Sequence, residues 1–156
     1  MSQQGVRGYY QLTSTIEEEL LSNQLTNTVS IGDISKLNLN KQDTFPLAHM
    51  IVNNVTVEEQ VLRFNISILA CDIVDQSKDV TTDRFVGNDN EQDILNTQLA
   101  VLNKLIQRLR MGTLHQDMYQ LNGDPNCTPF MDRFENQLAG WSASMDILIY
   151  NDINIC

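Results

Sequence analysis

The sequence contains 156 residues, of which 42% are hydrophobic, and its formal net charge is −10. This length predicts a single domain over residues 1–156, with enough apolar side chains for one core. No apolar run reaches the roughly 20 residues that span a bilayer. Residues 1–13 lack the apolar segment of a secretory signal, so we expect neither a membrane anchor nor export. The excess of acids disfavours adhesive binding to nucleic acid, because it repels a phosphate backbone.

The first predicted elements are an amphipathic helix and a short strand. Over residues 9–25, Leu12, Ile16 and Leu20 recur at helical spacing, and three glutamates lie on the opposite side. Residues 28–34 alternate apolar and polar side chains, which predicts a strand that is broken at Gly32.

Residues 45–75 carry the strongest β pattern of the chain. Two β-rich runs, residues 47–57 and 61–74, are joined by a polar tripeptide, which predicts a long antiparallel hairpin. One face of the second run is apolar throughout, and its other face becomes apolar only from Leu69 onward. Residues 47–52 are apolar on both faces apart from His49, so we expect protein on both sides of this strand, the second cover coming from another copy of the chain.

A polar, acidic connection over residues 76–90 is typical of a loop that contacts partners. Together with the first run of the hairpin, it predicts a subunit interface. The residues assigned to it are Pro46, Leu47, His49, Ile51, Asp79 and Phe85.

The second half of the chain predicts a long helix followed by strands. Residues 91–111 carry an apolar stripe at alternating four- and three-residue steps, formed by Leu95, Leu99, Leu102, Ile106 and Leu109. A short strand over residues 118–121, a turn over residues 123–126 and a strand over residues 139–150 follow. The whole pattern predicts an α+β fold, a mainly antiparallel sheet with a long hairpin packed by two helices.

No pattern of residues predicts a catalytic, metal or cofactor site. The two histidines, His49 and His115, stand alone, and no nucleophile, zinc or phosphate-loop motif occurs. A satisfied core or interface histidine is the favoured interpretation of His49. Cys71, Cys127 and Cys156 form no close pair, so we expect inert thiols without a disulfide or a zinc site.

Two other functions remain as alternatives. Asp72 is the one acid in register with the apolar face of its strand, so it lies either at an exposed strand end or buried against a partner group. A small soluble enzyme or ligand-binding domain would use Asp72 and His49. A nucleic-acid-binding protein would need its cations to converge on one face, namely Arg84, Lys104, Arg108, Arg110 and Arg133.

The runs FPLAHMIV, RFNISILACDIVD and LAGWSASMDILI, with this order of elements, resemble tail-terminator and neck-ring proteins of tailed bacteriophages. The runs are also similar to virion proteins of Bacteroidota phages, including the crAss-like group. The resemblance implies a structural virion protein without enzymatic residues, made in the bacterial host cytoplasm. It implies a homo-oligomeric ring, sixfold or twelvefold, that joins the portal and connector to the tail.

In such a ring, DNA would pass through the channel without specific binding. Acids are the favoured lining, because every basic contact to a phosphate would have to break as the genome moves. Two sets are candidates, and the alternative is that both only solvate the outer surface. They are Asp75, Asp79, Asp83 and Asp89 in one set, and Glu17, Glu18 and Glu19 in the other.

Overall fold

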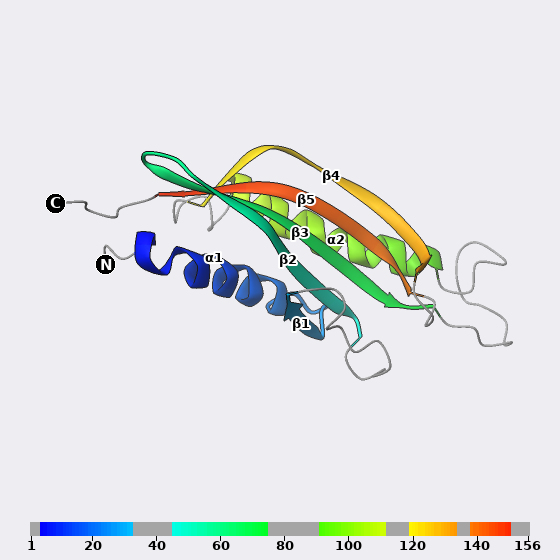
Figure 1. The fold of residues 1–156 in the computed structure, drawn as a ribbon. Coiled ribbons are helices and arrows are strands. Elements are labelled where there is room, and N and C mark those ends of the chain that lie inside the picture. The colour runs from blue at the N-terminus through cyan, green and yellow to red at the C-terminus, as the bar shows by residue number, and fades with distance from the viewer. Residues whose placement is uncertain (1–3, 33–44, 75–90, 112–118, 134–137, 151–156) are drawn as a thin grey trace, which may run out of the picture.

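The computed structural model describes residues 4–32, 45–74, 91–111, 119–133 and 138–150, which form two helices and one five-stranded sheet (Figure 1). In chain order the elements are α1 (Gln4–Leu21), β1 (Thr28–Ile31), β2 (Leu47–Val57), β3 (Val61–Ile73), α2 (Glu91–Met111), β4 (Gln120–Arg133) and β5 (Leu138–Tyr150). The predicted α+β class is confirmed. Neither described helix combines the length and the apolar composition needed to cross a membrane.

The sheet is open and mixed, with the strand order β1-β2-β3-β5-β4. Strand β1 pairs with β2 in parallel, whereas every other neighbouring pair is antiparallel. The predicted hairpin is confirmed as β2 and β3, and its pairing shifts at a β-bulge between Val52 and Asn54. The bounds of β2 and α2 are those that the sequence predicts.

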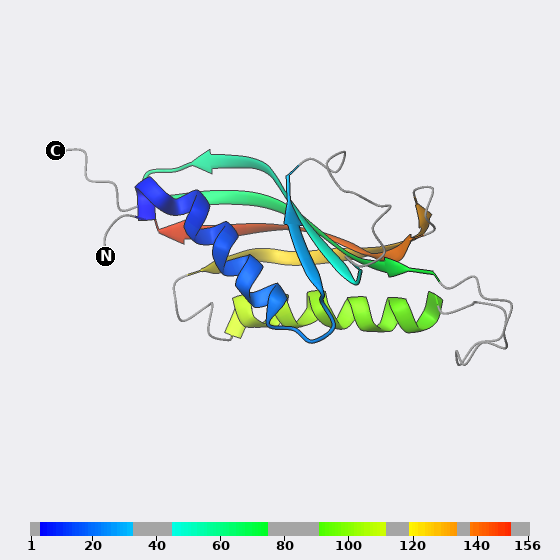
Figure 2. The ribbon, with the colours of Figure 1, turned by 90° about the horizontal axis from the view of Figure 1, so that it is seen from below.

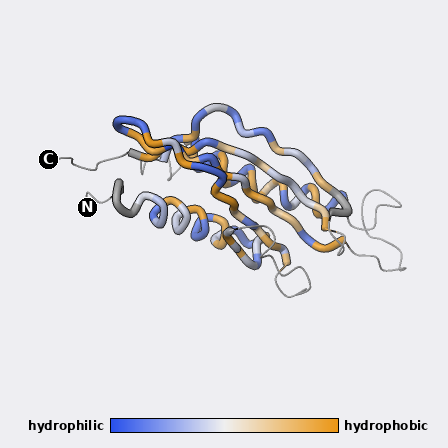
Figure 3. Tube along the Cα trace, in the orientation of Figure 1, coloured by the Kyte–Doolittle hydropathy of each residue, from blue (hydrophilic) through white to orange (hydrophobic). Residues whose placement is uncertain are grey.

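Both helices cover the same face of the sheet, which we call the helix face (Figure 2). Alternate residues of β3 explain why, since Phe64, Ile66 and Ile68 all point to this face and are 2% exposed or less. They pack with Leu12 of α1 and Leu102 of α2 in one hydrophobic cluster. Figure 3 shows hydrophobic residues along the strands and both helices, whereas the tip of the β2–β3 hairpin is hydrophilic.

Helix α1 is shifted toward the N-terminus relative to the predicted range of residues 9–25. It ends at Leu21 because Asn23 forms a local turn: its side-chain Oδ1 accepts a hydrogen bond from the Leu25 amide at 3.0 Å. At the other end of the helix, Gly8 is buried, and a Cβ at this position would lie 3.1 Å from Leu62 Cδ1. The helix therefore extends over a stretch without an apolar stripe, where a small residue allows close packing.

The predicted turn at residues 123–126 is wrong, because β4 runs through it as one strand (Gln120–Arg133). A bulge absorbs the turn residues: Asn122 pairs with Asp146 and Asn126 pairs with Ser144, so four steps along β4 oppose two along β5. Gly123 supplies a positive φ of 78° in this bulge. Strand β4 lies at the sheet edge, where a proline removes no ladder hydrogen bond from a neighbour.

Candidate interaction surfaces

The sheet face opposite the helices carries a hydrogen-bonded row of polar side chains from three neighbouring strands. We call its members, Asn53, Asn65, Ser67, Ser144 and Asp146, the polar ladder. The Asn53 amide donates to Asn65 Oδ1 and to Ser67 Oγ, both at 2.8 Å. The Asn65 amide donates to Asp146 Oδ1 at 2.8 Å, and the Ser67 and Ser144 hydroxyls are 3.0 Å apart. The ladder thus connects β2, β3 and β5 across the sheet.

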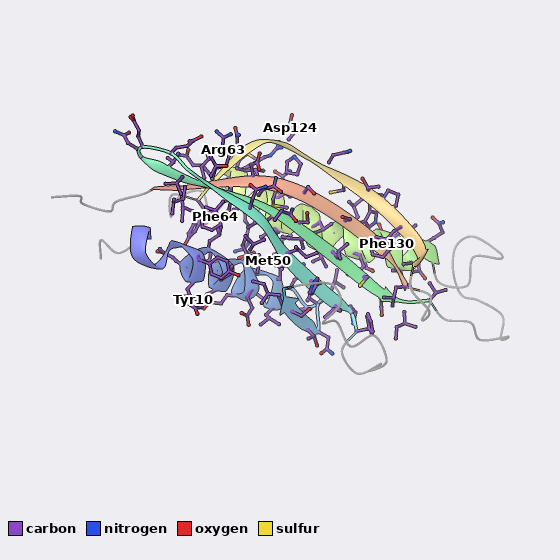
Figure 4. The ribbon with its side chains drawn as sticks, in the orientation of Figure 1. Tyr10, Met50, Arg63, Phe64, Asp124 and Phe130 are labelled. Carbon is purple, nitrogen blue, oxygen red and sulfur yellow. The ribbon has the colours of Figure 1, made fainter. Side chains whose placement is uncertain are left out.

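No described helix lies over the polar ladder, so we call this side of the sheet the open face. Successive residues of β3 alternate between the two faces, and Figure 4 shows Arg63 and Phe64 on opposite sides of the sheet. Arg63 forms an ion pair with Glu58 at 3.0 Å and its side chain is 39% exposed. The open face is therefore polar and accessible over the middle of the sheet.

At one end of the open face the side chains are apolar and buried. Leu47, Leu69 and Cys71 form a buried cluster there with three further side chains, those of Phe45, Phe130 and Leu138. Leu47 is 2% exposed within a single chain. The expectation that another copy provides the second cover of this strand is therefore wrong for Leu47, because side chains of the same chain already bury it.

Of the six residues assigned to a subunit interface, the structure describes four, and two of these are buried. Leu47 and His49 are 2% and 1% exposed, whereas Pro46 and Ile51 are half-buried. Asp79 and Phe85 lie outside the described residues. The assignment stays a prediction, and the accessible part of it among the described residues is limited to Pro46 and Ile51.

His49 is a buried histidine with both ring nitrogens hydrogen-bonded inside the chain. Its Nε2 lies 2.9 Å from the Gly32 carbonyl oxygen, and its Nδ1 lies 2.7 Å from the Ser30 hydroxyl. A carbonyl only accepts, so Nε2 carries a proton and, in the neutral ring, Nδ1 accepts from Ser30. These hydrogen bonds connect β2 to the edge strand β1 and to Gly32, which follows it. The favoured interpretation of His49 as a satisfied core histidine is confirmed.

Asp72 lies near the end of β3 and is half-buried. Its Oδ1 accepts a hydrogen bond from the Ile73 amide at 2.8 Å. Burial raises the pKa of its carboxyl, and the hydrogen bond from Ile73 opposes that rise. His49 pairs with Leu69 of β3, so these two side chains lie on the same face of the sheet. Asp72 is three residues further along β3, and because side chains alternate along a strand, it lies on the opposite face from His49. The two residues of the alternative catalytic or ligand-binding site are not brought together.

The cysteines and acids of the described residues form no metal site. Burial raises the pKa of the Cys71 thiol to about 12, helped by the neighbouring Asp72 charge. Burial also raises the pKa of the Cys127 thiol. Within the described ranges, no group of three or more histidine, cysteine, aspartate or glutamate side chains is placed to hold an ion. Cys156 lies outside the described residues.

Two basic residues of α2, Arg108 and Arg110, form ion pairs with different elements, contrary to the convergence that a nucleic-acid-binding surface requires. Arg108 Nε lies 2.8 Å from Glu19 of α1, whereas Arg110 Nη2 lies 2.6 Å from Asp124 of β4. These two cations therefore point to different elements. The structure does not describe Arg84 or the side chain of Arg133.

A groove of about 460 Å³ lies between the outer side of α2 and β4. Its lining combines apolar and carboxamide side chains with one cation: Asn96, Leu99, Ala100, Asn103, Ile106, Gln107, Arg110, Pro125 and Cys127. Leu99 belongs to the apolar stripe that the sequence predicts for α2, and it is 37% exposed because it lines this groove. The groove was not predicted from the sequence, since it depends on the course of β4.

Beside the hydrophilic turn of the β2–β3 hairpin, two apolar side chains of β2 are accessible. Val55 and Val57 are 40% and 73% exposed, and the exposed Glu59 follows them in the turn. Figure 1 shows this tip at the end of the sheet where α1 begins. Strand β1 pairs only with Leu47 to Met50, so the outer side of β2 continues past its neighbour to the tip.

A comparison with known proteins found no family model and no curated protein that matches the chain.

Proposed function

We propose that the chain is a structural subunit of a ring in the neck or tail of a tailed bacteriophage, with a fold of the tail-terminator type. The ring joins the portal and connector to the tail, and six or twelve copies close it. The observation that carries the proposal is the one-sided cover of the sheet. Both helices lie on the helix face, while the open face, the hairpin tip and the α2–β4 groove remain accessible.

Accessible surfaces of this kind favour assembly. The hydrogen bonds of the polar ladder are made within the chain, so the ladder can meet a polar, hydrated neighbour without leaving Asn65 or Ser67 unpaired. Exposed apolar side chains at the hairpin tip and in the groove supply the surface whose burial stabilises association. These features lie on different parts of the molecule, as the contacts of a ring subunit require.

The enzyme alternative has less support. It needs His49 to be reachable by a substrate and close to Asp72. His49 is 1% exposed, its ring nitrogens bond Ser30 and Gly32, and Asp72 points to the other face. His49 fits a structural role in β1–β2 pairing.

The acidic charge suits a channel through which DNA slides. With a net charge of −10 per chain, a ring presents a mainly repulsive wall to a duplex. Glu17 and Glu18 are exposed on α1 and are candidates for this wall, whereas Glu19 pairs with Arg108 and braces α1 against α2. The set at Asp75, Asp79, Asp83 and Asp89 lies outside the described residues.

Mass photometry and negative-stain microscopy over a concentration series test the proposal. Rings of uniform size are expected at high concentration, and mass spectrometry of purified virions is expected to detect the chain. A protein that stays monomeric at every concentration and is absent from virions would contradict the proposed function.

The role of the channel wall has a separate test. Particles that carry Glu17→Lys and Glu18→Lys are expected to assemble and to eject DNA more slowly at low salt than at high salt. Ejection that matches the wild type at all salt concentrations would rule out this pair of acids as channel lining.

A further inference from the structure

We propose that the hairpin tip of one copy docks in the α2–β4 groove of the next copy and that this contact closes the ring. The inference rests on the proposed function and adds to it which two surfaces meet. The tip comprises Val55, Val57 and Glu59, and the groove is lined by residues of α2 and β4.

The groove has the chemistry of a socket for small apolar side chains. Leu99, Ala100 and Cys127 supply apolar surface, and Leu99 remains 37% exposed in the single chain. The carboxamides of Asn96 and Asn103 also line it, and these groups both donate and accept hydrogen bonds. An extended segment entering the groove would thus find apolar contacts and partners for its backbone.

Arg110 gives the groove a positive charge. Its Nη2 contacts the Asp124 carboxylate at 2.6 Å and the Gly123 carbonyl oxygen at 3.5 Å. Both contacts use the same nitrogen of a group that has five N–H donors, and the Asp124 side chain is 90% exposed. The remaining N–H groups of the guanidinium can therefore donate hydrogen bonds to a second carboxylate, from a neighbouring chain.

The hairpin tip matches the groove in side-chain chemistry and in charge. Val57 is 73% exposed, Val55 is 40% exposed, and both are short, stiff side chains on an extended strand. Glu59 is an exposed acid two residues beyond Val57, whereas Glu58 is engaged by Arg63. The tip thus presents two valines followed by one available carboxylate, and the groove presents apolar side chains, among them Leu99, together with Arg110.

The two surfaces belong to different parts of one molecule, so their contact is heterologous. A heterologous contact repeats from copy to copy and generates a closed ring when its rotation divides a full turn, whereas a contact of a surface with itself stops at a dimer. Direct strand pairing at β4 is disfavoured, because Pro125 and Pro129 donate no hydrogen bond and the bulge interrupts the edge. Side-chain docking in the groove avoids this obstacle.

Disulfide trapping tests the contact with a thiol that the chain already has. Val57→Cys places a thiol at the tip, native Cys127 lines the groove, and Cys156→Ser removes a further thiol in every variant. Oxidation at pH 8.5 of assembled protein is expected to give a ladder of covalent dimers, trimers and larger species on non-reducing gels. Cys127→Ser in the same background removes the ladder.

Tyr10→Cys is the matched control, because Tyr10 is also 73% exposed but lies on α1. It is expected to give at least tenfold less product above the dimer. Since burial raises the pKa of Cys127, a second pair, Val57→Cys with Asn103→Cys in a Cys127→Ser chain, places the thiol at an exposed position of the groove. Rings in micrographs with no ladder from either pair would overturn the docking contact and leave the proposed function in place. Protein that forms no ring at any concentration would overturn both.

A charge exchange gives an independent test. Glu59→Lys or Arg110→Glu alone is expected to raise the concentration required for ring formation at least tenfold, and the two together are expected to recover most of this loss. Glu18→Lys makes the same charge change on α1 and is expected to alter the concentration required for ring formation less than threefold. Single variants that assemble like the wild type, or a double variant that assembles no better than either, would contradict the role of this charge pair.

Discussion

The two faces of the sheet are built from the same strands, yet they differ in what they bury. On the helix face, Phe64 and Ile66 are 2% and 0% exposed. On the open face, their neighbours Arg63 and Asn65 stay accessible and bond other polar side chains. The difference indicates that the stability of the fold is concentrated on the helix face. The side chains in the middle of the open face contribute little to the hydrophobic core.

The strongest way to break this comparison is to truncate a helix-face residue. Phe64→Ala is expected to lower the free energy of unfolding by about 4 kcal/mol, since it removes a large side chain and leaves a cavity in the core. Urea denaturation followed by circular dichroism measures the change. Arg63→Ala, one residue away on the open face, is the control and is expected to change it by less than about 1 kcal/mol. Equal losses would contradict the difference between the faces.

Gly140 is the place where the open face has no spare room. A Cβ at this position would collide with the Ala70 carbonyl oxygen and lie 2.7 Å from Cys71 Cα, both in the backbone of β3. Gly140→Ala is therefore expected to destabilise the fold by about 3 kcal/mol, because the paired strands must move apart.

Gly123→Ala is the comparison for this variant. A Cβ added at Gly123 would have no atom within 4 Å, so only the positive φ of 78° opposes the substitution. We expect Gly123→Ala to lower the free energy of unfolding by about 1 kcal/mol. Thermal and urea unfolding of both variants measure the contrast. A smaller loss for Gly140→Ala than for Gly123→Ala would show that β3 and β5 are less tightly held than the register implies.

The polar ladder sharpens the comparison at a smaller scale. Asn65 links Asn53 to Asp146, so Asn65→Ala is expected to lower the free energy of unfolding by about 1 kcal/mol. A double-mutant cycle with Asp146→Ala is expected to give a coupling of about 0.5 kcal/mol. Strictly additive effects would mean that the Asn65–Asp146 bond does not stabilise the isolated chain.

The smallest expected effect concerns Asp72 and depends on pH. Burial raises the pKa of this carboxyl above 3.8, so its ionised form is less favourable in the folded chain than in the unfolded one. Asp72→Asn is expected to raise the free energy of unfolding at pH 7 by less than about 1 kcal/mol, since the group is partly exposed. The gain is lost as the pH falls through the raised folded-state pKa towards 3.8, and below 3.8 Asp72 is neutral in both states.

Urea unfolding at pH 7 and pH 3 measures this difference, with the exposed Glu18→Gln as the control. A stabilisation by Asp72→Asn that is equally large at both values would assign the effect to something other than the charge.

The sequence by itself determined the elements whose pattern is local. The period-two alternation of residues 61–73 and the helical stripe of residues 91–111 arise from neighbours along the chain, so β3 and α2 were found almost residue for residue. The same reasoning identified one face of β3 as core and the other as polar until Leu69. It also favoured a satisfied role for His49, because an isolated histidine within an apolar strand has few other uses.

Only the tertiary structure decided the features that depend on distant partners. Gly123 and Pro125 have the local chemistry of a turn, and only their position on an edge strand, facing β5, lets them form a bulge instead. The parallel pairing of β1 with β2 and the placement of both helices on one face are set by packing between segments far apart in sequence. The groove and the exposure of Leu99 follow from that packing, because a helical stripe shows which residues are apolar but not how far the neighbouring strand covers them.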